Sequence, residues 1–301
     1  MKKIIKWIVL LGFIALAVLN IDKITDYFAE LLSDKPKLVI PEKNEYYKNI
    51  SYSFVQESED FIPYSKQDLK NIFYSILNNG YTNFTFYCPK EYTDCLTDTE
   101  SIIKDDTLLT NINNFVHPFN NFSNINVVYS SVGEVNVKVT KLYSNDDIEA
   151  VIHKVNEIYS QIITDDMSLD DKILTIHDYI INNTKYDQER ANNNSTYKSN
   201  IAYGPLLQGY AVCGGYADAM ALFLNKLNVP NYKVASLTHV WNAVKVNDKW
   251  LHIDLTWDDP VALNSDKDTL LHKFYLINTK KLESYKIDNH EYDKFTYAEL
   301  S

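Results

Sequence analysis

Apolar residues recur every three or four positions in several stretches of the chain, which is the spacing of one face of an α-helix. A long face of this kind runs from Ile148 to Ile162, after Ser144, a residue type that caps helices. Ser65 and Ser168 precede two further stretches in the same way. The pattern predicts helices at residues 65–79, 98–115, 145–162, 169–181 and 213–227.

In other segments apolar and polar residues alternate, which is the pattern of a half-buried β-strand. Val135, Val137 and Val139 share one face of such a segment, and Gly133 precedes them as a turn residue. We expect strands at residues 46–56, 84–88, 125–139 (as a pair), 232–237, 239–246 and 249–257. The order of helices and strands predicts an α+β fold in which a smaller α+β domain precedes a second domain.

Asn247-Asp248 lies between the last two alternating segments and predicts a two-residue hairpin turn. In the register that this turn sets, Trp241 faces Asp254, and His239 is the diagonal neighbour of Asp254. Because side chains alternate along a strand, four of them are expected on one face: His239, Trp241, His252 and Asp254.

The length of 301 residues allows one large domain or two modest ones. We divide the predicted fold into an accessory α+β domain at residues 46–143 and a second domain at residues 144–301. The accessory domain has no chemical motif, so its expected roles are spacing, docking or substrate selection. A net charge of −11 argues against nucleic acid as a partner, because binding to phosphates needs a basic surface.

Residues 1–21 combine lysines directly after Met1 with an apolar run in which Lys6 is the single charge. This segment predicts a signal peptide, with Ala15-Leu16-Ala17 as a cleavage site, or an uncleaved membrane anchor with its N-terminus inside. We interpret the charged residues 22–45 as a tether. In both cases the rest of the chain is expected outside the cytosol.

The chain has three cysteines, Cys88, Cys95 and Cys213. Cys88 and Cys95 are close in sequence, and an oxidising compartment would allow them to pair as a disulfide. Cys213 is then the unpaired thiol. It precedes two glycines and an apolar run of helical length that Pro230 cannot continue. A helix N-terminus lowers the pKa of a thiol and makes it a nucleophile, whereas the plainer alternative is a buried structural cysteine.

The candidate residues provide the three groups that nucleophilic catalysis by a thiol needs. Cys213 is the predicted nucleophile, His239 holds its proton, and Asp254 orients the imidazole. His252 is a competing base on the same face, but it shares a strand with Asp254 and is less easily oriented by it. Aromatic residues near these positions either shape a substrate channel or pack in the core: Trp241, Trp257 and Tyr216.

A metal site built from Cys213, His239, His252 and Asp254 would lack the closely spaced ligand pairs of zinc motifs. We therefore expect no metal and no cofactor. His177, inside its predicted helix, is interpreted as a packed or surface residue rather than a ligand.

Three stretches together resemble the transglutaminase-like superfamily of papain-like thiol enzymes: Val212–Ala217, His239–Asn242 and Trp250–Asp259. Two further stretches resemble its bacterial branch: Lys185-Tyr186-Asp187 and Phe274-Tyr275-Leu276. The resemblance covers residues 145–280. It implies an α+β core in which a cysteine-bearing helix packs on an antiparallel sheet, with Cys213, His239 and Asp254 as the catalytic triad.

The resemblance further implies acyl transfer through a thioester, which is resolved by water in a protease or amidase and by an amine in a cross-linking transglutaminase. We expect an exported or surface-anchored enzyme that acts on a protein or peptide, with cell-surface protein or cell-wall peptide as candidate substrates. Contact with the membrane is expected through residues 1–21. The alternative is a catalytically silent domain of the same fold with a binding or structural role at the cell surface, which intact Cys, His and Asp residues disfavour.

Overall fold

The structure is a computed structural model that describes residues 20–21, 38–130, 133–192, 195–259 and 270–301. Most of the predicted signal peptide or anchor and most of the tether lie outside the described residues. Within the described part of the chain, no helix has the length and apolar character that crossing a membrane requires. Pro41–Ser301 forms one compact unit.

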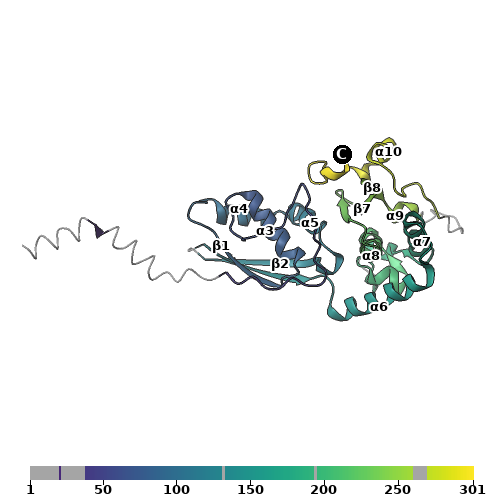
Figure 1. The fold of residues 1–301 in the computed structure, drawn as a ribbon, viewed down its shortest axis with the longest axis horizontal. Helices are drawn as coiled ribbons and strands as arrows, with labels where there is room; N and C mark the ends of the chain where they lie inside the picture. Colours follow the sequence, from purple (N-terminus) through teal and green to yellow (C-terminus); the bar gives the residue numbers. More distant parts are fainter. Residues whose placement is uncertain (1–19, 22–37, 131–132, 193–194, 260–269) are drawn as a thin grey trace, which may run out of the picture. The chain divides into compact units, whose positions relative to one another are not determined.

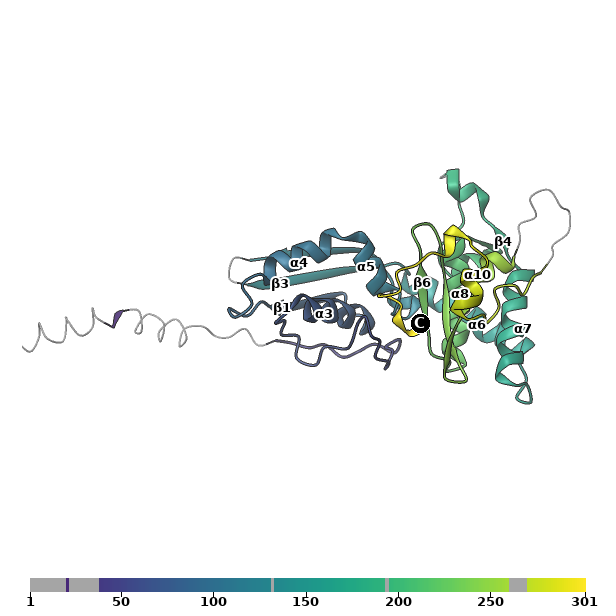
Figure 2. The ribbon, with the colours of Figure 1, turned by 90° about the horizontal axis from the view of Figure 1, so that it is seen from above.

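The first elements of this unit are α3 (Lys66–Asn78), β1 (Asn83–Tyr87), α4 (Cys95–Lys104), α5 (Asp106–Asn113), a short 3₁₀ turn (Pro118–Asn120), β2 (Phe122–Tyr129) and β3 (Glu134–Lys141). The strands form an antiparallel sheet in the order β1-β3-β2. Helices cover one of its faces, as Figures 1 and 2 show from two directions. Val135, Val137 and Val139 are buried on that side of β3, which confirms the predicted alternation.

The caps of two helices explain where they begin. The Ser65 side chain accepts a hydrogen bond from the backbone of Asp68, and α3 ends before Gly80, which has a φ of 73°. Ser144 and Asp147 form a capping box at the start of the next helix, where each side chain accepts from the other's backbone. Both helix starts were predicted from these serines.

Two expectations for this region are wrong. Residues 46–56 form no strand, because the Tyr52 backbone donates to Val55 O at 3.2 Å in a turn, and the adjacent Phe54 and Val55 are both buried. The helix expected at 98–115 is two helices. The Asp105 side chain accepts from the backbone N–H of Leu108 at 2.9 Å and begins α5 there.

The remaining elements of three or more residues are α6 (Asn145–Ile162), α7 (Leu169–Asn182), a 3₁₀ segment (Gln188–Asn192), a π-helical turn (Gly204–Gln208), α8 (Cys213–Lys226), β6 (Asn231–Ala235), β7 (Val240–Val246), β8 (Lys249–Ile253), α9 (Leu255–Asp258), α10 (Thr279–Ser284) and two 3₁₀ turns (Asp288–His290 and Ala298–Leu300). Two short strands, β4 (Lys185–Tyr186) and β5 (Tyr210–Ala211), pair in parallel. The strands β6, β7 and β8 form an antiparallel sheet in that order.

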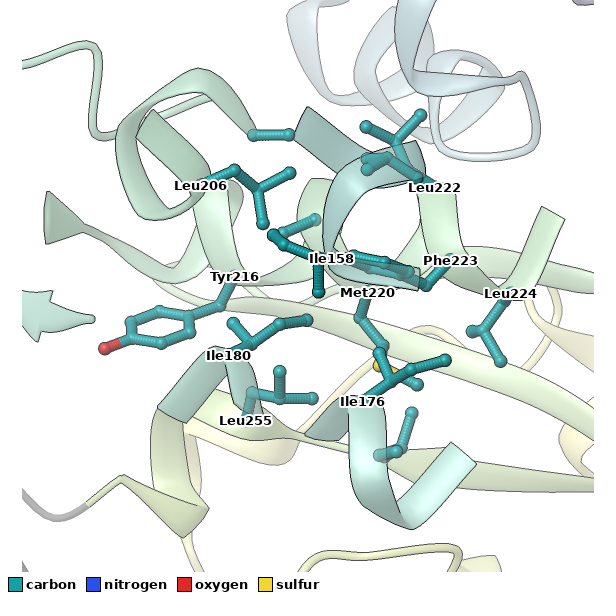
Figure 3. Packing of buried hydrophobic residues seen from close by; sticks show 14 of the residues in the cluster. Ile158, Ile176, Ile180, Leu206, Tyr216, Met220, Leu222, Phe223, Leu224 and Leu255 are labelled. Carbon is teal, nitrogen blue, oxygen red and sulfur yellow. The ribbon is translucent and has the colours of Figure 1, made fainter. Parts of the chain in front are cut away.

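Helix α8 is the centre of the core, because all ten residues from Gly215 to Leu224 are buried. Figure 3 shows Met220 and Phe223 of this helix packed among side chains from neighbouring elements, including Ile158 of α6 and Ile176 of α7. The helix also contacts β6 and β7. A helix that is apolar on all sides is expected to be enclosed in this way. The cysteine-bearing helix therefore packs on an antiparallel sheet, as the α+β prediction requires.

Candidate active site

Cys213 is the first residue of α8, and its side chain is a half-buried free thiol. The N–H groups of Gly215 and Tyr216 donate to Val212 O at 2.9 and 3.2 Å. The N–H groups of Cys213 and Gly214 precede these bonds and lie at the open end of the helix. An anion that forms near the thiol is therefore favoured by the helix dipole and by these donors.

Close backbone contacts require glycine at both positions after Cys213. The segment Ser199–Ile201 crosses the start of α8, and Val212 N–H donates to Ser199 O at 2.9 Å. A Cβ on Gly215 would lie 2.3 Å from Ser199 O, and one on Gly214 would lie 2.9 Å from Asn200 O. Only glycine fits this close approach, so the pair allows the crossing segment to hold the cysteine end of the helix.

The hairpin that carries the other candidates is formed as predicted. Asn247 and Asp248 have φ values of 50° and 58°, the conformation of a two-residue type I′ turn. Val246 pairs with Lys249, and this register continues along β7 and β8. Trp241 Nε1 donates to His252 Nδ1 at 3.0 Å, so these two side chains share a face.

The predicted strand 249–257 is too long, because β8 ends at Ile253. The carboxylate of Asp254 accepts from the backbone N–H groups of Thr256 and Trp257 at 3.0 and 3.3 Å and caps the short helix α9. Asp254 thus stands where the strand becomes a helix. One of its oxygens is held by the helix, and the other is left for the histidines.

His239 and Asp254 form a close, buried contact. Their side chains are 5% and 2% exposed, and His239 Nε2 donates to Asp254 Oδ2 at 2.6 Å. The thiol of Cys213 also acts on this imidazole, because it contributes to the raised pKa of His239. The structure brings the three predicted residues together, with one imidazole between the thiol and the carboxylate.

This arrangement makes the imidazolium unusually stable. Burial lowers the pKa of His239, but the charge and hydrogen bond of Asp254 and the interaction with Cys213 outweigh it and raise the pKa to about 10. Burial would raise the pKa of Asp254, yet the charge of His239 and the hydrogen bonds from His239 and His290 lower it to about 2. Each group stabilises the charged form of the other.

His290 is the residue of this site that sequence reasoning missed. Its side chain is 3% exposed, and Nε2 lies 2.8 Å from Asp254 Oδ2, the oxygen that His239 also contacts. The ring stacks on Phe274 with centroids 5.0 Å apart. His290 stands 36 positions after Asp254, outside every motif and every periodic segment. The sequence around it offers no pattern that could have identified it.

Both ring nitrogens of His252, the competing base, are hydrogen-bonded to neutral side chains. Its Nδ1 accepts from Trp241 and its Nε2 lies 3.0 Å from Thr279 Oγ1. Burial and the nearby His290 lower the pKa of His252 to about 3, so it is a neutral imidazole. It supports the hairpin, whereas His239 is the imidazole that interacts with Cys213.

The three aromatic candidates differ in exposure. Trp241 and Tyr216 are each 1% exposed, so they offer no surface to a substrate in this structure. Trp241 stacks on the His239 ring at 5.6 Å, and the Tyr216 hydroxyl donates to Asp259. Trp257 is half-buried and packs 5.3 Å from His290. A role in shaping a channel stays a prediction for Trp257.

Cys88, directly after β1, and Cys95, the first residue of α4, form a disulfide with Cα atoms 5.7 Å apart. Cys213 is thus the free thiol of the chain.

Tyr186 of β4 pairs with Ala211, two residues before Cys213, and the charge of a thiolate at Cys213 acts on its hydroxyl. Burial and then Cys213 raise the pKa of Tyr186, so the hydroxyl keeps its proton at neutral pH. The strand pair β4–β5 therefore places Tyr186 in the neighbourhood of the cysteine.

Comparisons with known proteins bear on this region. The family model of the transglutaminase-like superfamily matches residues 156–255. No curated protein matches the chain in a sequence comparison. Among solved structures, the chain resembles a TGase with 17% identity and a TM-score of 0.32, over 48% of this chain and 46% of that one.

It also resembles a candidate cysteine protease from Cytophaga hutchinsonii with 14% identity and a TM-score of 0.29, over 44% of this chain and 61% of that one. A candidate protease from Parabacteroides distasonis aligns with 13% identity and a TM-score of 0.26, over 44% and 39% of the two chains. The chain thus spans less than two thirds of each of these proteins. Residues 156–255, which include Cys213, His239 and Asp254, belong to the transglutaminase-like superfamily.

Proposed function

We propose that this chain is a thiol enzyme that cleaves or transfers amide acyl groups, with Cys213 as nucleophile, His239 as base and acid, and Asp254 as the orienting carboxylate. One observation supports this most strongly: a single buried imidazole is hydrogen-bonded to a carboxylate and has its pKa raised by a free thiol as well. A structural cysteine has no need of such a partner. Paired in this way, a thiol can transfer its proton to the imidazole.

In the proposed first step, the sulfur of Cys213 attacks the carbonyl carbon of an amide and a carbon–sulfur bond forms. The carbon–nitrogen bond then breaks, and the imidazolium of His239 gives its proton to the leaving amine. In the second step, water or an amine attacks the thioester and loses a proton to His239, and the thiol is released. Water yields an acid, as in a peptidase or amidase, and an amine yields a new amide, as in cross-linking.

The negative oxygen of the tetrahedral intermediate needs donors. The N–H of Cys213 at the start of α8 is one, and the hydroxyl of Tyr186, whose pKa Cys213 raises, is the second that we propose. The N–H of Cys213 lies at the half-buried end of the helix, where a carbonyl group would approach the sulfur.

We further propose that the enzyme works outside the cytosol on a protein or peptide, with cell-surface protein or cell-wall peptide as substrate. The apolar, lysine-preceded segment at residues 1–21 supports export or anchoring. The disulfide between Cys88 and Cys95 fits an oxidising compartment.

Alkylation by iodoacetamide tests the proposal, because Cys213 is the single free cysteine. We expect fast labelling near neutral pH in the full-length chain, and labelling slowed to the rate of an ordinary thiol in His239→Ala. His153→Ala, which removes an exposed histidine from α6, is the matched control and should label like the wild type. Equal rates in the wild type and His239→Ala would instead favour a catalytically silent binding or structural domain.

A second assay separates the two enzyme classes. The chain is incubated with a glutamine-bearing protein and a labelled primary amine, and incorporation of the amine is compared with release of ammonia. Incorporation identifies a cross-linking enzyme, whereas release of ammonia or peptide without incorporation identifies a hydrolase. Cys213→Ser should abolish either product.

A further inference from the structure

A cluster of metal-binding residue types lies near the C-terminal end of α9, whereas Asp254 caps the N-terminal end of this helix. His177 and Asp178 are on α7, and His272 is in the segment that follows residues 260–269. Asp178 Oδ1 lies 2.8 Å from both His177 Nδ1 and His272 Nε2. The three atoms lie within 4.8 Å of one another. Helices α7 and α9 lie side by side, as Figure 1 shows.

The donor set suits one class of ion. Two imidazole nitrogens and one carboxylate oxygen are the ligands of zinc and similar transition metals, whereas calcium and magnesium prefer oxygen ligands alone. The His177 side chain is fully buried, while those of Asp178 and His272 are 30% and 44% exposed. The cluster is thus closed on the protein side and reachable from solvent.

We propose that His177 Nδ1, Asp178 Oδ1 and His272 Nε2 bind one divalent transition-metal ion, with Zn²⁺ the best match, and that water completes its coordination. The site contains no residue of the triad, and its existence does not depend on the proposed acyl transfer. His177, which looks like a packed helical histidine in the sequence, becomes the buried ligand.

A buried carboxylate next to His177 supports this assignment. Its Nε2 lies 3.3 Å from Asp258 Oδ2, and Asp258 is completely buried. The carboxylate of Asp258 is itself held by the backbone N–H of Phe274, at 2.9 and 3.2 Å from its two oxygens. Metal-binding histidines commonly donate their second N–H to such a carboxylate, which fixes the ring and leaves the other nitrogen for the ion. Here that nitrogen is Nδ1.

Binding requires a local adjustment of the three ligand atoms. With metal–ligand bonds of about 2.0–2.1 Å, ligand atoms in a tetrahedral site are about 3.3 Å apart. The oxygen of Asp178 would therefore move back by about 0.5 Å from each histidine, and the two histidine nitrogens, which lie within 4.8 Å of each other, would also settle about 3.3 Å apart. The partly exposed side chains of Asp178 and His272 have room for this movement, and the buried His177 can stay in place.

The ion would connect α7 to the segment that supports the catalytic carboxylate. Two residues after His272, Phe274 O accepts from the backbone N–H of Asp254 at 3.2 Å. Further along, Ile277 and His252 form a β-bridge beside β8. Binding at His272 would thus brace the strand end that positions Asp254, which is a structural role for the metal.

Direct metal binding tests the proposal without use of activity. The full-length chain is stripped with a chelator and titrated with Zn²⁺ by calorimetry, and the bound metal is counted by elemental analysis. We expect one ion per chain and a rise in the melting temperature, with affinity reduced at least tenfold in His272→Ala and Asp178→Ala. The exposed His153→Ala on α6 is the matched control and should bind like the wild type. We avoid His177→Ala because removal of a buried side chain can unfold the protein.

Cobalt separates this site from the catalytic cysteine. Co²⁺ bound by nitrogen and oxygen ligands gives visible ligand-field bands without a thiolate-to-cobalt charge-transfer band, and Cys213→Ser should leave the spectrum unchanged. No uptake of Zn²⁺ or Co²⁺, uptake that persists in His272→Ala, or a thiolate band that disappears in Cys213→Ser would each overturn the proposal. None of these results depends on whether the chain is an acyl-transfer enzyme.

Discussion

His290 Nε2 lies 2.8 Å from Asp254 Oδ2 in the buried centre of the site. The same oxygen accepts from His239, and the other oxygen of Asp254 is held by the N–H groups that begin α9. The carboxylate therefore has no freedom to rotate away from His239. We infer that His290 is a positioning residue, which acts on the reaction through Asp254.

Replacement of His290 by alanine should slow both alkylation of Cys213 and turnover. A hydrogen bond to a charged group contributes about 1.5–3 kcal/mol, so a loss of roughly tenfold to a hundredfold is expected. His290→Gln, which keeps a donor, should recover much of the rate. The readout is the pH profile of alkylation, since a merely structural defect would lower the rate without shifting the profile. An unshifted profile in His290→Ala would contradict a positioning role.

Tyr186 gives a prediction that separates two reactions of the same thiol. If its hydroxyl stabilises the oxyanion, Tyr186→Phe should lower turnover of an amide or ester substrate by about 10²-fold, the effect of removing one such donor. Alkylation by iodoacetamide forms no oxyanion, so its rate should not change. Tyr210→Phe on the paired strand β5 is the matched control. Equal slowing of both reactions would mean that Tyr186 acts on the thiol itself.

The hairpin and its shared face could be predicted because they depend on local chemistry. Asn247-Asp248 is a turn sequence, and alternation alone then places His239 and Trp241 on the face of His252. The end of β8 was misjudged, although Asp254 is a residue type that caps helices. The alternating apolar residues before it favoured continuation of the strand.

Other features could not be predicted because they depend on contacts between distant parts of the chain. His290 meets Asp254 through the path of the C-terminal segment, which no pattern encodes. Residues 46–56 look like a strand, but no neighbouring strand pairs with them among the described residues, and their buried side chains pack as an irregular segment. Whether residues 46–143 form a separate domain stays a prediction.

The stability of the protein should depend on pH through His239. Its pKa is raised from 6.5 to about 10 in the folded state, so the folded state binds the proton more tightly than the unfolded state. The resulting stabilisation is fully present below pH 6.5 and is lost as the pH rises toward 10. Melting temperatures of the wild type and His239→Ala should therefore converge across this window.

Lys48 also titrates in this pH range, so the wild type alone would not isolate the contribution of His239. Burial and the nearby Lys233 lower the pKa of Lys48 to about 7, which contributes a pH dependence of the opposite sign above that value. The contribution of Lys48 is present in both proteins and cancels in their difference. A difference in melting temperature that grows between pH 6.5 and 10 would show that the imidazolium does not stabilise the fold.

Asp218 joins the cysteine-bearing helix α8 to Lys233 of β6 and to Tyr143. Its loss should therefore lower the stability of the fold. Its carboxylate is 1% exposed and lies 2.8 Å from both Lys233 Nζ and the Tyr143 hydroxyl. Asp218→Ala would leave the buried ammonium of Lys233 without its partner, so we expect a loss of about 3–5 kcal/mol in the free energy of unfolding, measured in urea. The double variant Asp218→Ala/Lys233→Met removes both charges and should recover part of that loss. If the double variant is no more stable than Asp218→Ala, the cost comes from the hydrogen bond of Tyr143 and not from the unpaired charge.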